Sequence, residues 1–427
     1  MIKAIVFVSA GAWLSLTAFL AAAPAAPGEK VEELTPDGAW CWFADPRAVY
    51  HEGRKKCTYV GWVNRAGDVR VAAIDAAGRT VAATLHEKFQ RDDHANPAIL
   101  VRPDGRLMVF CSAHGGRDMC CRVSERPEDV SAWGPERTIG VNTEGRSGYT
   151  YPSPFILSRE PGPIYLFWRG ADWKPTFATS EDGETWSPAR TLIAGRASGG
   201  NRPYTKYCSN GVDTIHCIFT DGHPRNEPAN SVYYAALRGG ALWRADGTKI
   251  KDVTAGPLVF DEADKVYDGA AGGARAWIWD LALDASGRPV VAFSTIPDPA
   301  DHRYHYARWD GKAWVGREIT PAGKYIDGPQ EPQYSGGMSL DPNAPATVYL
   351  SREIAGVHEI QKWTTSDGGA TWTSRPVTEG SAKGNFRPYV PRGPRGNVEA
   401  FWMHGDYPSY TTYQTAIRYL PAAGAAR

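Results

Sequence analysis

Residues 92–117 read DDHANPAILVRPDGRLMVFCSAHGGR and predict an antiparallel β-hairpin. Two apolar runs, 98–101 and 107–111, flank an RPDG turn, and Pro and Gly are typical of the connections in such hairpins. Both strands then end on the same side, so His94 and His114 should meet at the open end. Two imidazoles that titrate near neutral pH are candidates for an acid/base pair. The alternative is that each ring only hydrogen-bonds a loop carbonyl.

The same pattern of apolar run, polar turn and apolar run recurs along the chain. The second runs begin near residues 57, 107, 164, 215, 289, 347 and 398, and one longer gap precedes the run at 289. A repeat of this length is typical of four-stranded propeller blades. The sequence therefore predicts an all-β fold, a seven-bladed β-propeller that forms a single domain over residues 27–427, with the end strands closing the ring.

A second repeat supports the same fold. The segments SEDGETW (180–186) and TSDGGATW (365–372) have the form of Asp-box turns, and looser forms occur at 309–314 and 243–247. In such a turn Asp and Gly shape a tight loop, and we expect the Trp to pack between blades. Their role is therefore structural.

The first 26 residues predict a signal peptide, because a basic residue precedes an apolar stretch and then a run of small residues. The apolar stretch is too short to predict a membrane span. We expect a secreted or periplasmic protein. Lys plus Arg and Asp plus Glu both number 47, so no overall field favours nucleic acid or a membrane. No protein partner is evident either.

Seven cysteines in an exported chain could form disulfides. An odd number leaves at least one of them unpaired or bound to a metal, and the sequence does not give the connectivity.

In a propeller of this kind, the open ends of the seven hairpins should lie on one face. Polar and aromatic side chains concentrate at these ends and predict a basic canyon that suits an acidic polysaccharide or oligosaccharide. The residues expected to bind substrate there are Asn96, Tyr151, Arg202, Tyr204, Trp279, Tyr334 and Arg387. The side chains that leave the second strands include His114, Arg169, His223 and Arg225.

Four segments carry a family resemblance: CWFADPRAVY (41–50), the hairpin 92–117, YPSPFILS (151–158) followed by IYLFWRG, and RPYTKYCSNGVDTIHCIFTDGHPR (202–225). Together they resemble the BNR-repeat family of secreted bacterial propellers, which includes polysaccharide lyases that act on ulvan. The resemblance covers nearly the whole mature chain.

In lyases of this kind a histidine pair, a tyrosine and an arginine surround a uronic acid. The resemblance implies His94 and His114 as the pair, Tyr207 as the tyrosine with Tyr204 as the alternative, and Arg225 as the arginine. It requires no cofactor for the chemistry.

Some members of the family hold a structural zinc. Cys208, Cys217 and His223, together with His216, are the right residue types for such a site. Against this, His216 and Cys217 are adjacent and would face opposite sides of a strand.

The resemblance implies β-elimination at a uronate. An arginine on the carboxylate would stabilise the enolate-like transition state, and acid/base side chains would move the protons. We assign His94 as base, Tyr207 as acid and Arg225 to the carboxylate, with His114 assisting, although the roles could be exchanged.

Two other functions compete with the lyase. The first is a sialidase or other glycosidase, which would use Arg47, Arg202 and Arg387 with Tyr334 as nucleophile. The second is a propeller that binds carbohydrate without catalysis, because a fold alone does not establish an activity.

Overall fold

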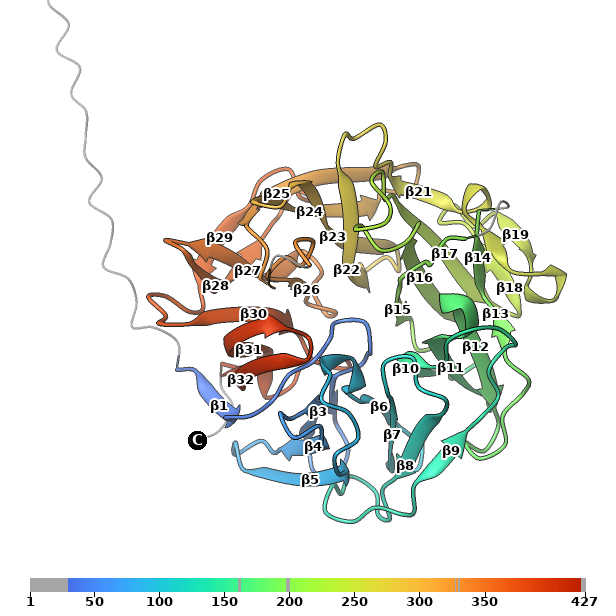
Figure 1. Ribbon diagram of the computed structural model, residues 1–427, viewed down its shortest axis with the longest axis vertical. Coiled ribbons are helices and arrows are strands. Elements are labelled where there is room, and N and C mark those ends of the chain that lie inside the picture. Colours follow the sequence, from blue (N-terminus) through green and yellow to red (C-terminus); the bar gives the residue numbers. More distant parts are fainter. Residues whose placement is uncertain (1–29, 160–162, 197–199, 327, 329–330, 424–427) are drawn as a thin grey trace, which may run out of the picture.

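The computed structural model describes residues 30–159, 163–196, 200–326, 328 and 331–423. Seven antiparallel sheets stand around one axis as the blades of a propeller (Figure 1). The predicted all-β, seven-bladed fold is therefore confirmed. The predicted signal peptide, residues 1–26, lies outside the described residues.

The first four blades follow the chain from the blue to the yellow-green part of Figure 1. Blade 1 contains β2 (Ala48–His51), β3 (Cys57–Val63), β4 (Val69–Ile74) and β5 (Thr80–His86). Blade 2 contains β6 (Ala98–Val101), β7 (Leu107–Ser112), β8 (Met119–Val123) and β9 (Arg137–Ile139). Blade 3 contains β10 (Thr150–Ile156), β11 (Ile164–Arg169), β12 (Pro175–Ser180) and β13 (Arg190–Thr191). Blade 4 contains β15 (Thr205–Ser209), β16 (Thr214–Thr220), β17 (Val232–Arg238), β18 (Ala241–Trp243), β19 (Lys249–Asp252) and β21 (Asp264–Tyr267).

The last three blades complete the ring, and short elements join the sheets. Blade 5 contains β22 (Arg275–Leu283), β23 (Pro289–Asp298), β24 (Asp301–Trp309) and β25 (Trp314–Gly323). Blade 6 contains β26 (Met338–Leu340), β27 (Thr347–Ile354), β28 (Val357–Thr364) and β29 (Thr373–Pro376). Blade 7 contains β30 (Gly384–Tyr389), β31 (Val398–Ser409), β32 (Thr412–Pro421) and β1 (Glu32–Thr35). The remaining elements are the parallel pair β14 (Ile193–Gly195) and β20 (Leu258–Val259), and the 3-10 turns η1 (Asp93–Ala95), η2 (Ala171–Trp173), η3 (Val253–Ala255) and η4 (Phe260–Glu262).

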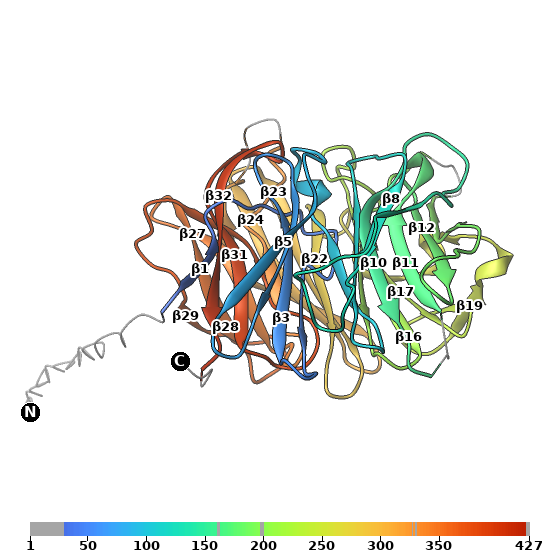
Figure 2. The same ribbon diagram turned by 90° about the horizontal axis from the view of Figure 1, so that it is seen from below.

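The two ends of the described chain meet in blade 7. The N-terminal strand β1 pairs antiparallel with the C-terminal strand β32, so the last sheet contains both ends of the propeller. Figures 1 and 2 both show β1 beside β32. The expectation that the end strands close the ring is confirmed, and closure protects the edges that an open sheet would expose.

The Asp-box turns hold neighbouring blades together. Asp182 accepts hydrogen bonds from the backbone N–H groups of Glu184 and Thr185, each at 2.7 Å. The turn places Trp186 of blade 3 edge-on to Phe110 of blade 2, with ring centroids 6.0 Å apart.

The Asp-box turns at 309–314 in blade 5 and 365–372 in blade 6 place their Trp residues in the same way. Trp372 of blade 6 lies 5.3 Å from Tyr306 of blade 5, and Trp314 of blade 5 lies 5.2 Å from Tyr234 of blade 4. In each case the Trp contacts the preceding blade, as predicted.

The segment between β1 and β2 fills the axis of the propeller. Trp42 stacks on Trp279 with ring centroids 4.4 Å apart, and its indole N–H donates to the carbonyl of Ile278 at 3.1 Å. The buried ammonium of Lys206 donates to the carbonyl of Trp42 and to the carboxylate of Asp45. Side chains of this segment are therefore packed at the axis of the propeller.

All seven cysteines lie among the described residues, and each is a free thiol. The structure therefore contains none of the disulfides that the sequence allowed. Within the described part of the chain, no helix has both the length and the hydropathy that a membrane crossing requires.

Candidate functional site

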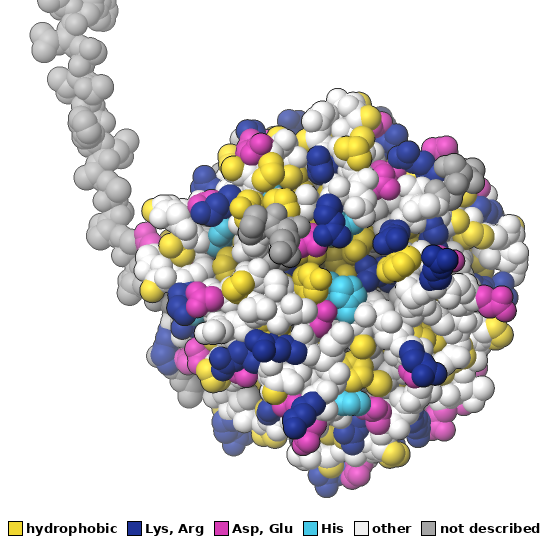
Figure 3. Space-filling model, in the orientation of Figure 1, with side chains coloured by type: hydrophobic (Ala, Val, Ile, Leu, Met, Phe, Trp, Pro, Cys, Tyr) yellow, Lys and Arg dark blue, Asp and Glu magenta, His cyan; other side chains and the backbone are white. Residues whose placement is uncertain are grey.

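The hairpin predicted from residues 92–117 forms as β6 and β7, with Ala98 opposite Phe110 and Val101 opposite Leu107. It brings His94 and His114 together. Their rings are stacked with centroids 3.9 Å apart and an angle of 7° between the planes. Histidine side chains are visible near the centre of the ring in Figure 3. The predicted meeting of the two imidazoles is therefore present in the structure.

Asp92 joins the two histidines. Its Oδ1 accepts a hydrogen bond from Nδ1 of His94 at 2.5 Å, and its Oδ2 accepts one from Nδ1 of His114 at 3.1 Å. The same Oδ1 accepts the backbone N–H of His94 at 2.9 Å and so fixes the turn η1. Because a carboxylate only accepts hydrogen bonds, Nδ1 of each histidine carries a proton. In a neutral His114 ring, Nε2 then carries no hydrogen.

Asp93 lies on the buried side of the pair. Its Oδ1 is 3.1 Å from Nδ1 of His94, and its Oδ2 accepts hydrogen bonds from the guanidinium of Arg387 and the hydroxyl of Tyr407. Arg387 is buried and neutralises Asp93. The ring of Tyr410, at the tip of the β31–β32 hairpin, meets His94 edge-on at 5.0 Å.

The two imidazoles have different protonation. Burial opposes a charge on His94, but the carboxylate of Asp92 outweighs it and raises the pKa of His94 well above its usual value. Burial and the charge of His94 lower the pKa of His114 to about 4. At neutral pH the pair therefore holds one imidazolium, at His94, and one neutral imidazole, at His114. His114 is also the more accessible ring, since its side chain is 30% exposed and that of His94 is 6% exposed.

A belt of rings continues from the histidine pair around the axis. Successive centroids are 5.5 Å apart from His94 to Tyr151, 6.1 Å from Tyr151 to Tyr204, 5.7 Å from Tyr204 to His223 and 6.1 Å from His223 to Tyr334. Blades 2, 3 and 4, and the loop that precedes blade 6, contribute these rings. The belt gives an aromatic floor on which a sugar can stack.

The axial segment supports this floor from below. The ring of Phe43 lies 5.1 Å from Tyr151 and 5.0 Å from Tyr204, and the ring of Trp42 lies 5.4 Å from Tyr334. Tyr151 has a left-handed backbone with φ of 63°. A non-glycine residue in that conformation is strained, and such strain is common at functional sites.

Arg169, the last residue of β11, lies within the belt. Its guanidinium lies 4.6 Å from the centroid of Tyr151, and its Nη1 donates to the hydroxyl of Tyr204 at 2.8 Å. The side chain is buried, yet no carboxylate among the described residues pairs with it. An unpaired buried cation is costly, so its position marks a place where an anion would be stabilised.

The hydroxyl of Tyr151 also lacks a partner. It makes no hydrogen bond with any described residue, and the residue as a whole is only 7% exposed. Burial of the ring raises the pKa of Tyr151 well above its usual value, which keeps the hydroxyl protonated.

Arg225, unlike Arg169, pairs with a carboxylate. Its side chain is 51% exposed and forms an ion pair with Glu331, Nη1 to Oε1, at 2.5 Å. Its backbone N–H donates to Nδ1 of His223 at 3.1 Å. Arg225 therefore borders the belt, but its charge is already compensated.

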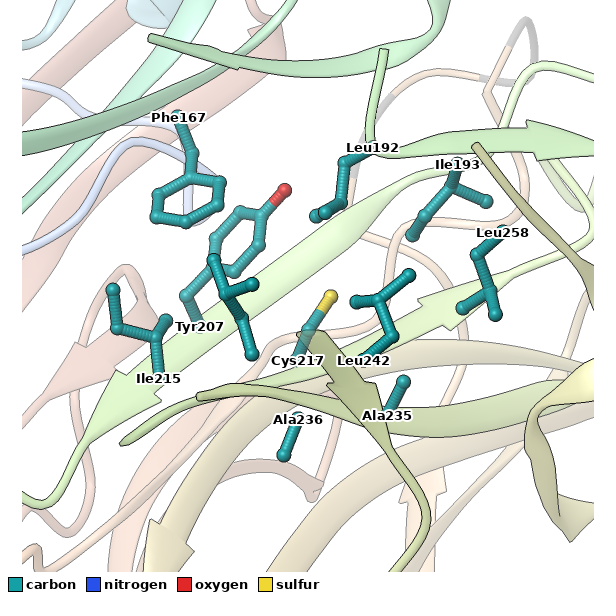
Figure 4. A pocket seen from close by; sticks show the side chains of 11 residues that line it. Phe167, Leu192, Ile193, Tyr207, Ile215, Cys217, Ala235, Ala236, Leu242 and Leu258 are labelled. Atoms are coloured by element: carbon teal, nitrogen blue, oxygen red, sulfur yellow. The ribbon is translucent and has the colours of Figure 1, made fainter. Parts of the chain in front are cut away.

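Tyr207 does not join the histidines, and its predicted place at the site is corrected. It lies in an apolar core between blades 3 and 4, where its ring stacks on Phe167 with centroids 4.5 Å apart (Figure 4). Its hydroxyl is buried and lacks a hydrogen-bond partner among the described residues. The alternative, Tyr204, lies in the belt.

Several residues predicted to bind substrate have structural partners instead. The amide of Asn96 accepts the backbone N–H of Cys41 at 3.0 Å and holds the axial segment. Trp279 is buried against Trp42 and donates to the hydroxyl of Ser294 at 3.1 Å. Arg387 forms an ion pair with Asp93.

The remaining predicted side chains reach the site or its margin. Tyr151, Tyr204 and Tyr334 belong to the belt. Arg202 is exposed beyond it, with its guanidinium 3.8 Å from the ring centroid of Trp173.

The residues proposed for zinc are not brought together. Cys217 lies in the apolar core with Tyr207, whereas Cys208 packs against a separate core that contains Trp277. His223 contacts Trp277 in the belt, with centroids 4.3 Å apart. Because Cys208 and Cys217 face different cores, one ion cannot bind both.

The site itself contains a better set of metal ligands. Ligand atoms of Asp92, His94 and His114 all lie within 4.8 Å of one another. Two imidazoles and a carboxylate suit a transition metal such as zinc. The hydrogen bonds of Asp92 satisfy the same atoms without an ion.

Asp92 and Asp93 have functions in the site that sequence reasoning did not assign. A signal was present, because two carboxylates stand directly before His94 at the start of a short turn. Tyr410 gave no such signal, since it lies 316 positions along the chain from His94.

Two ulvan lyases are similar to this chain. The protein from Nonlabens ulvanivorans is 25% identical over 385 residues, which cover 78% of this chain and 76% of that protein. The protein from Pseudoalteromonas sp. (strain PLSV) is 23% identical over 318 residues, which cover 63% of this chain and 60% of that protein, less than two thirds of its length.

A solved structure also matches this chain at low sequence identity. An α-L-arabinanase from Penicillium chrysogenum is 11% identical, with 92% of this chain and 99% of that chain covered and a TM-score of 0.44. Such a score carries no argument about activity. The model of the BNR repeat-containing family matches residues 57–322, more than half of the sequence, and the chain therefore belongs to that family.

Proposed function

We propose that this protein is a polysaccharide lyase that cleaves a uronate-containing polysaccharide, of the ulvan type, by β-elimination. The observation that carries the proposal is Arg169, a buried guanidinium without a counter-ion beside an acid/base histidine pair. The names of the two similar ulvan lyases support the same substrate class.

Arg169 is suited to hold the uronate carboxylate. Its charge, unlike that of Arg225, is not compensated by a carboxylate of the described chain. Abstraction of the proton α to the carboxylate creates further negative charge there. A guanidinium that is already in position stabilises this charge without reorganisation. This assigns to Arg169 the role predicted for Arg225.

His114 is suited to act as the base. It is neutral because its pKa is lowered to about 4, and Asp92 holds its proton on Nδ1, which leaves the lone pair on Nε2. His94, as the buried imidazolium, is the less accessible member. This exchanges the roles first assigned to the two histidines.

Tyr151 is suited to protonate the leaving oxygen. Its hydroxyl is protonated and makes no hydrogen bond with a described residue, and its ring lies next to Arg169 in the belt. Tyr204, whose hydroxyl already accepts from Arg169, is placed to fix the guanidinium. The reaction moves one proton from carbon to His114 and one from Tyr151 to the released sugar oxygen.

The glycosidase alternative has less support. Its three arginines do not converge: Arg47 pairs with Asp45, Arg387 pairs with Asp93, and Arg202 lies over Trp173 outside the belt. A carbohydrate-binding propeller without catalysis would need the aromatic belt. It would not need two histidines held in different protonation states.

The test is the ultraviolet absorbance of unsaturated uronate when the purified protein is mixed with ulvan. We expect elimination by the wild-type protein and a loss of roughly 10²–10⁴ in kcat for His114→Ala. His86→Ala is a matched control, because His86 is 31% exposed and its Nδ1 bonds Glu136 at 2.7 Å, but it lies in blade 1 at the end of β5. Absence of unsaturated products, or equal losses in both variants, would reject the proposal.

A further inference from the structure

A second cationic site lies beside the belt, at the junction of blades 3 and 4. It is an open groove of about 660 Å³. The residues that define it here are Arg146, Asp172, Trp173, Lys174, Arg196 and Arg202. Four of these six side chains are cationic and one is anionic, so the groove has an excess of positive charge on a protein whose overall charge is balanced.

The cations of the groove are largely uncompensated. Arg196 forms an ion pair with Asp221 at 2.9 Å. The side chains of Arg146 and Arg202 have no carboxylate partner among the described residues, and the ammonium of Lys174 donates only to the backbone carbonyl of Asn201. Burial and the charge of Arg202 lower the pKa of Lys174, against the opposing effect of Asp172. All four cations line the same groove, so they can act on one ligand.

The groove also has an aromatic wall. The guanidinium of Arg202 stacks on Trp173 at 3.8 Å from the ring centroid, which fixes a long side chain that would otherwise be mobile. A guanidinium held in this way loses less entropy when it binds an oxyanion in bidentate fashion.

The same two segments of chain build the groove and the belt. Arg169 ends β11 and Trp173 lies four positions later in η2, and Arg202 and Tyr204 lie two positions apart before β15. Arg169 bonds Tyr204 in the belt, and Arg202 stacks on Trp173 in the groove. A polymer held at Arg169 can therefore continue into the groove.

We propose that this groove binds an anionic group, a sulfate ester or a second carboxylate, on a sugar neighbouring the one held at Arg169. The inference rests on the proposed function, because that function places the polymer at Arg169. The binding of an anionic polysaccharide to the groove can be measured without catalysis. If the groove binds such a group, the protein should prefer polymers that carry charge on adjacent sugars.

The test compares the binding of ulvan and of chemically desulfated ulvan by affinity electrophoresis. The proteins are the His114→Ala variant, which keeps the polymer intact, and the same variant with Arg202→Ala or Arg238→Ala added. Arg238 is a matched control, since its guanidinium stacks on Trp243 at 4.3 Å in another pocket of blade 4.

Arg202→Ala should weaken the binding of ulvan by roughly tenfold, and Arg238→Ala should leave it unchanged. If the groove binds sulfate, the loss disappears with desulfated ulvan. If it binds a carboxylate, the loss remains. Lys174→Met should reproduce the effect of Arg202→Ala.

Equal binding by the Arg202 and Arg238 variants, or no binding of either polymer by the parent protein, would overturn the proposal. Failure of this proposal can be distinguished from failure of the proposed function. A protein that produces no unsaturated uronate but loses ulvan binding with Arg202→Ala would retain the groove and lose the lyase assignment.

Discussion

Asp92→Asn is the substitution that most directly tests the charge distribution of the site. It keeps the size of the side chain and removes the charge that two histidines share. An amide has one acceptor oxygen and one donor nitrogen, so it cannot accept from Nδ1 of both His94 and His114. If the nitrogen faces His114, the proton of that ring moves to Nε2 and the base is lost. If it faces His94, that ring loses its charge.

The size of the effect follows from the contacts of Asp92. A hydrogen bond to a charged group contributes about 1.5–3 kcal/mol, and one pKa unit corresponds to about 1.4 kcal/mol. Loss of the charge that faces His94 across a hydrogen bond of 2.5 Å should therefore lower the pKa of His94. Where the amide nitrogen faces His114, loss of the base should lower kcat by about 10²–10⁴.

Two measurements check this prediction. NMR titration of the histidine rings reports the change in pKa, and the pH profile of kcat/KM for ulvan reports its effect on elimination. Glu136→Gln is the control, because Glu136 bonds Nδ1 of His86 at 2.7 Å, outside the belt. This substitution should leave the titration of His94 and His114 and the pH profile of kcat/KM unchanged. Wild-type turnover by Asp92→Asn, with unchanged histidine titration, would refute the reasoning.

The remaining predictions concern the anion site, the acid, metal ions and pH. Arg169→Met should reduce kcat/KM for ulvan much more than Arg225→Met, because Arg225 pairs with Glu331 whereas Arg169 has no carboxylate partner among the described residues; equal losses in steady-state kinetics would contradict this. Tyr151→Phe should lower kcat by about 10²–10⁴ with little change in binding, as single-turnover kinetics would show. Zn²⁺ should inhibit elimination by binding the histidine pair, and a chelator should restore activity but not raise that of metal-free protein; activation by Zn²⁺ would be the opposite result. Burial lowers the pKa of His302 and His358 to about 4 each, below the value near 6.5 expected in the unfolded chain, so the unfolded state binds more protons between these values. The free energy of unfolding should therefore fall as pH drops from about 6.5 to about 4, by up to about 1.4 kcal/mol per pH unit for each histidine, and thermal denaturation at several pH values measures it.

The fold could be predicted from the sequence because its information is local and repeated. Each blade begins with a hairpin whose turn residues and apolar runs are adjacent in the chain, as in 92–117. The longer gap before residue 289 also has a physical cause. Blade 4 has six strands, two more than each of the other blades, and the pair β14–β20 lies beside it, so this blade uses more residues than the others.

The site could be predicted only in part. His94 and His114 meet because one hairpin carries both, so their proximity follows from a single turn. Tyr207 was assigned from its residue type and position in a motif, but its side chain faces the interface between blades 3 and 4. Tyr204, three residues earlier, lies before the strand begins and can face the axis.

The choice between arginines could not be made from the sequence. Arg387 looked suited to a substrate, yet Asp93 neutralises it from 294 positions away. Arg225 is compensated by Glu331, 106 positions away. Whether a cation is free for a ligand depends on such long-range partners, and propensities and spacings contain no information about them.

The axial segment connects the closing of the ring to the chemistry at its centre. β1 closes blade 7, the residues after it pass through the axis, and β2 then begins blade 1. Phe43 supports Tyr151 and Tyr204, while the carbonyl of Trp40 accepts a hydrogen bond from Arg387, which in turn holds Asp93. The segment that closes the ring and the segment that supports the belt are therefore continuous in the chain. The dipoles and charges of the belt are fixed before substrate arrives, and this preorganisation is what an electrostatic site needs in order to stabilise a developing negative charge.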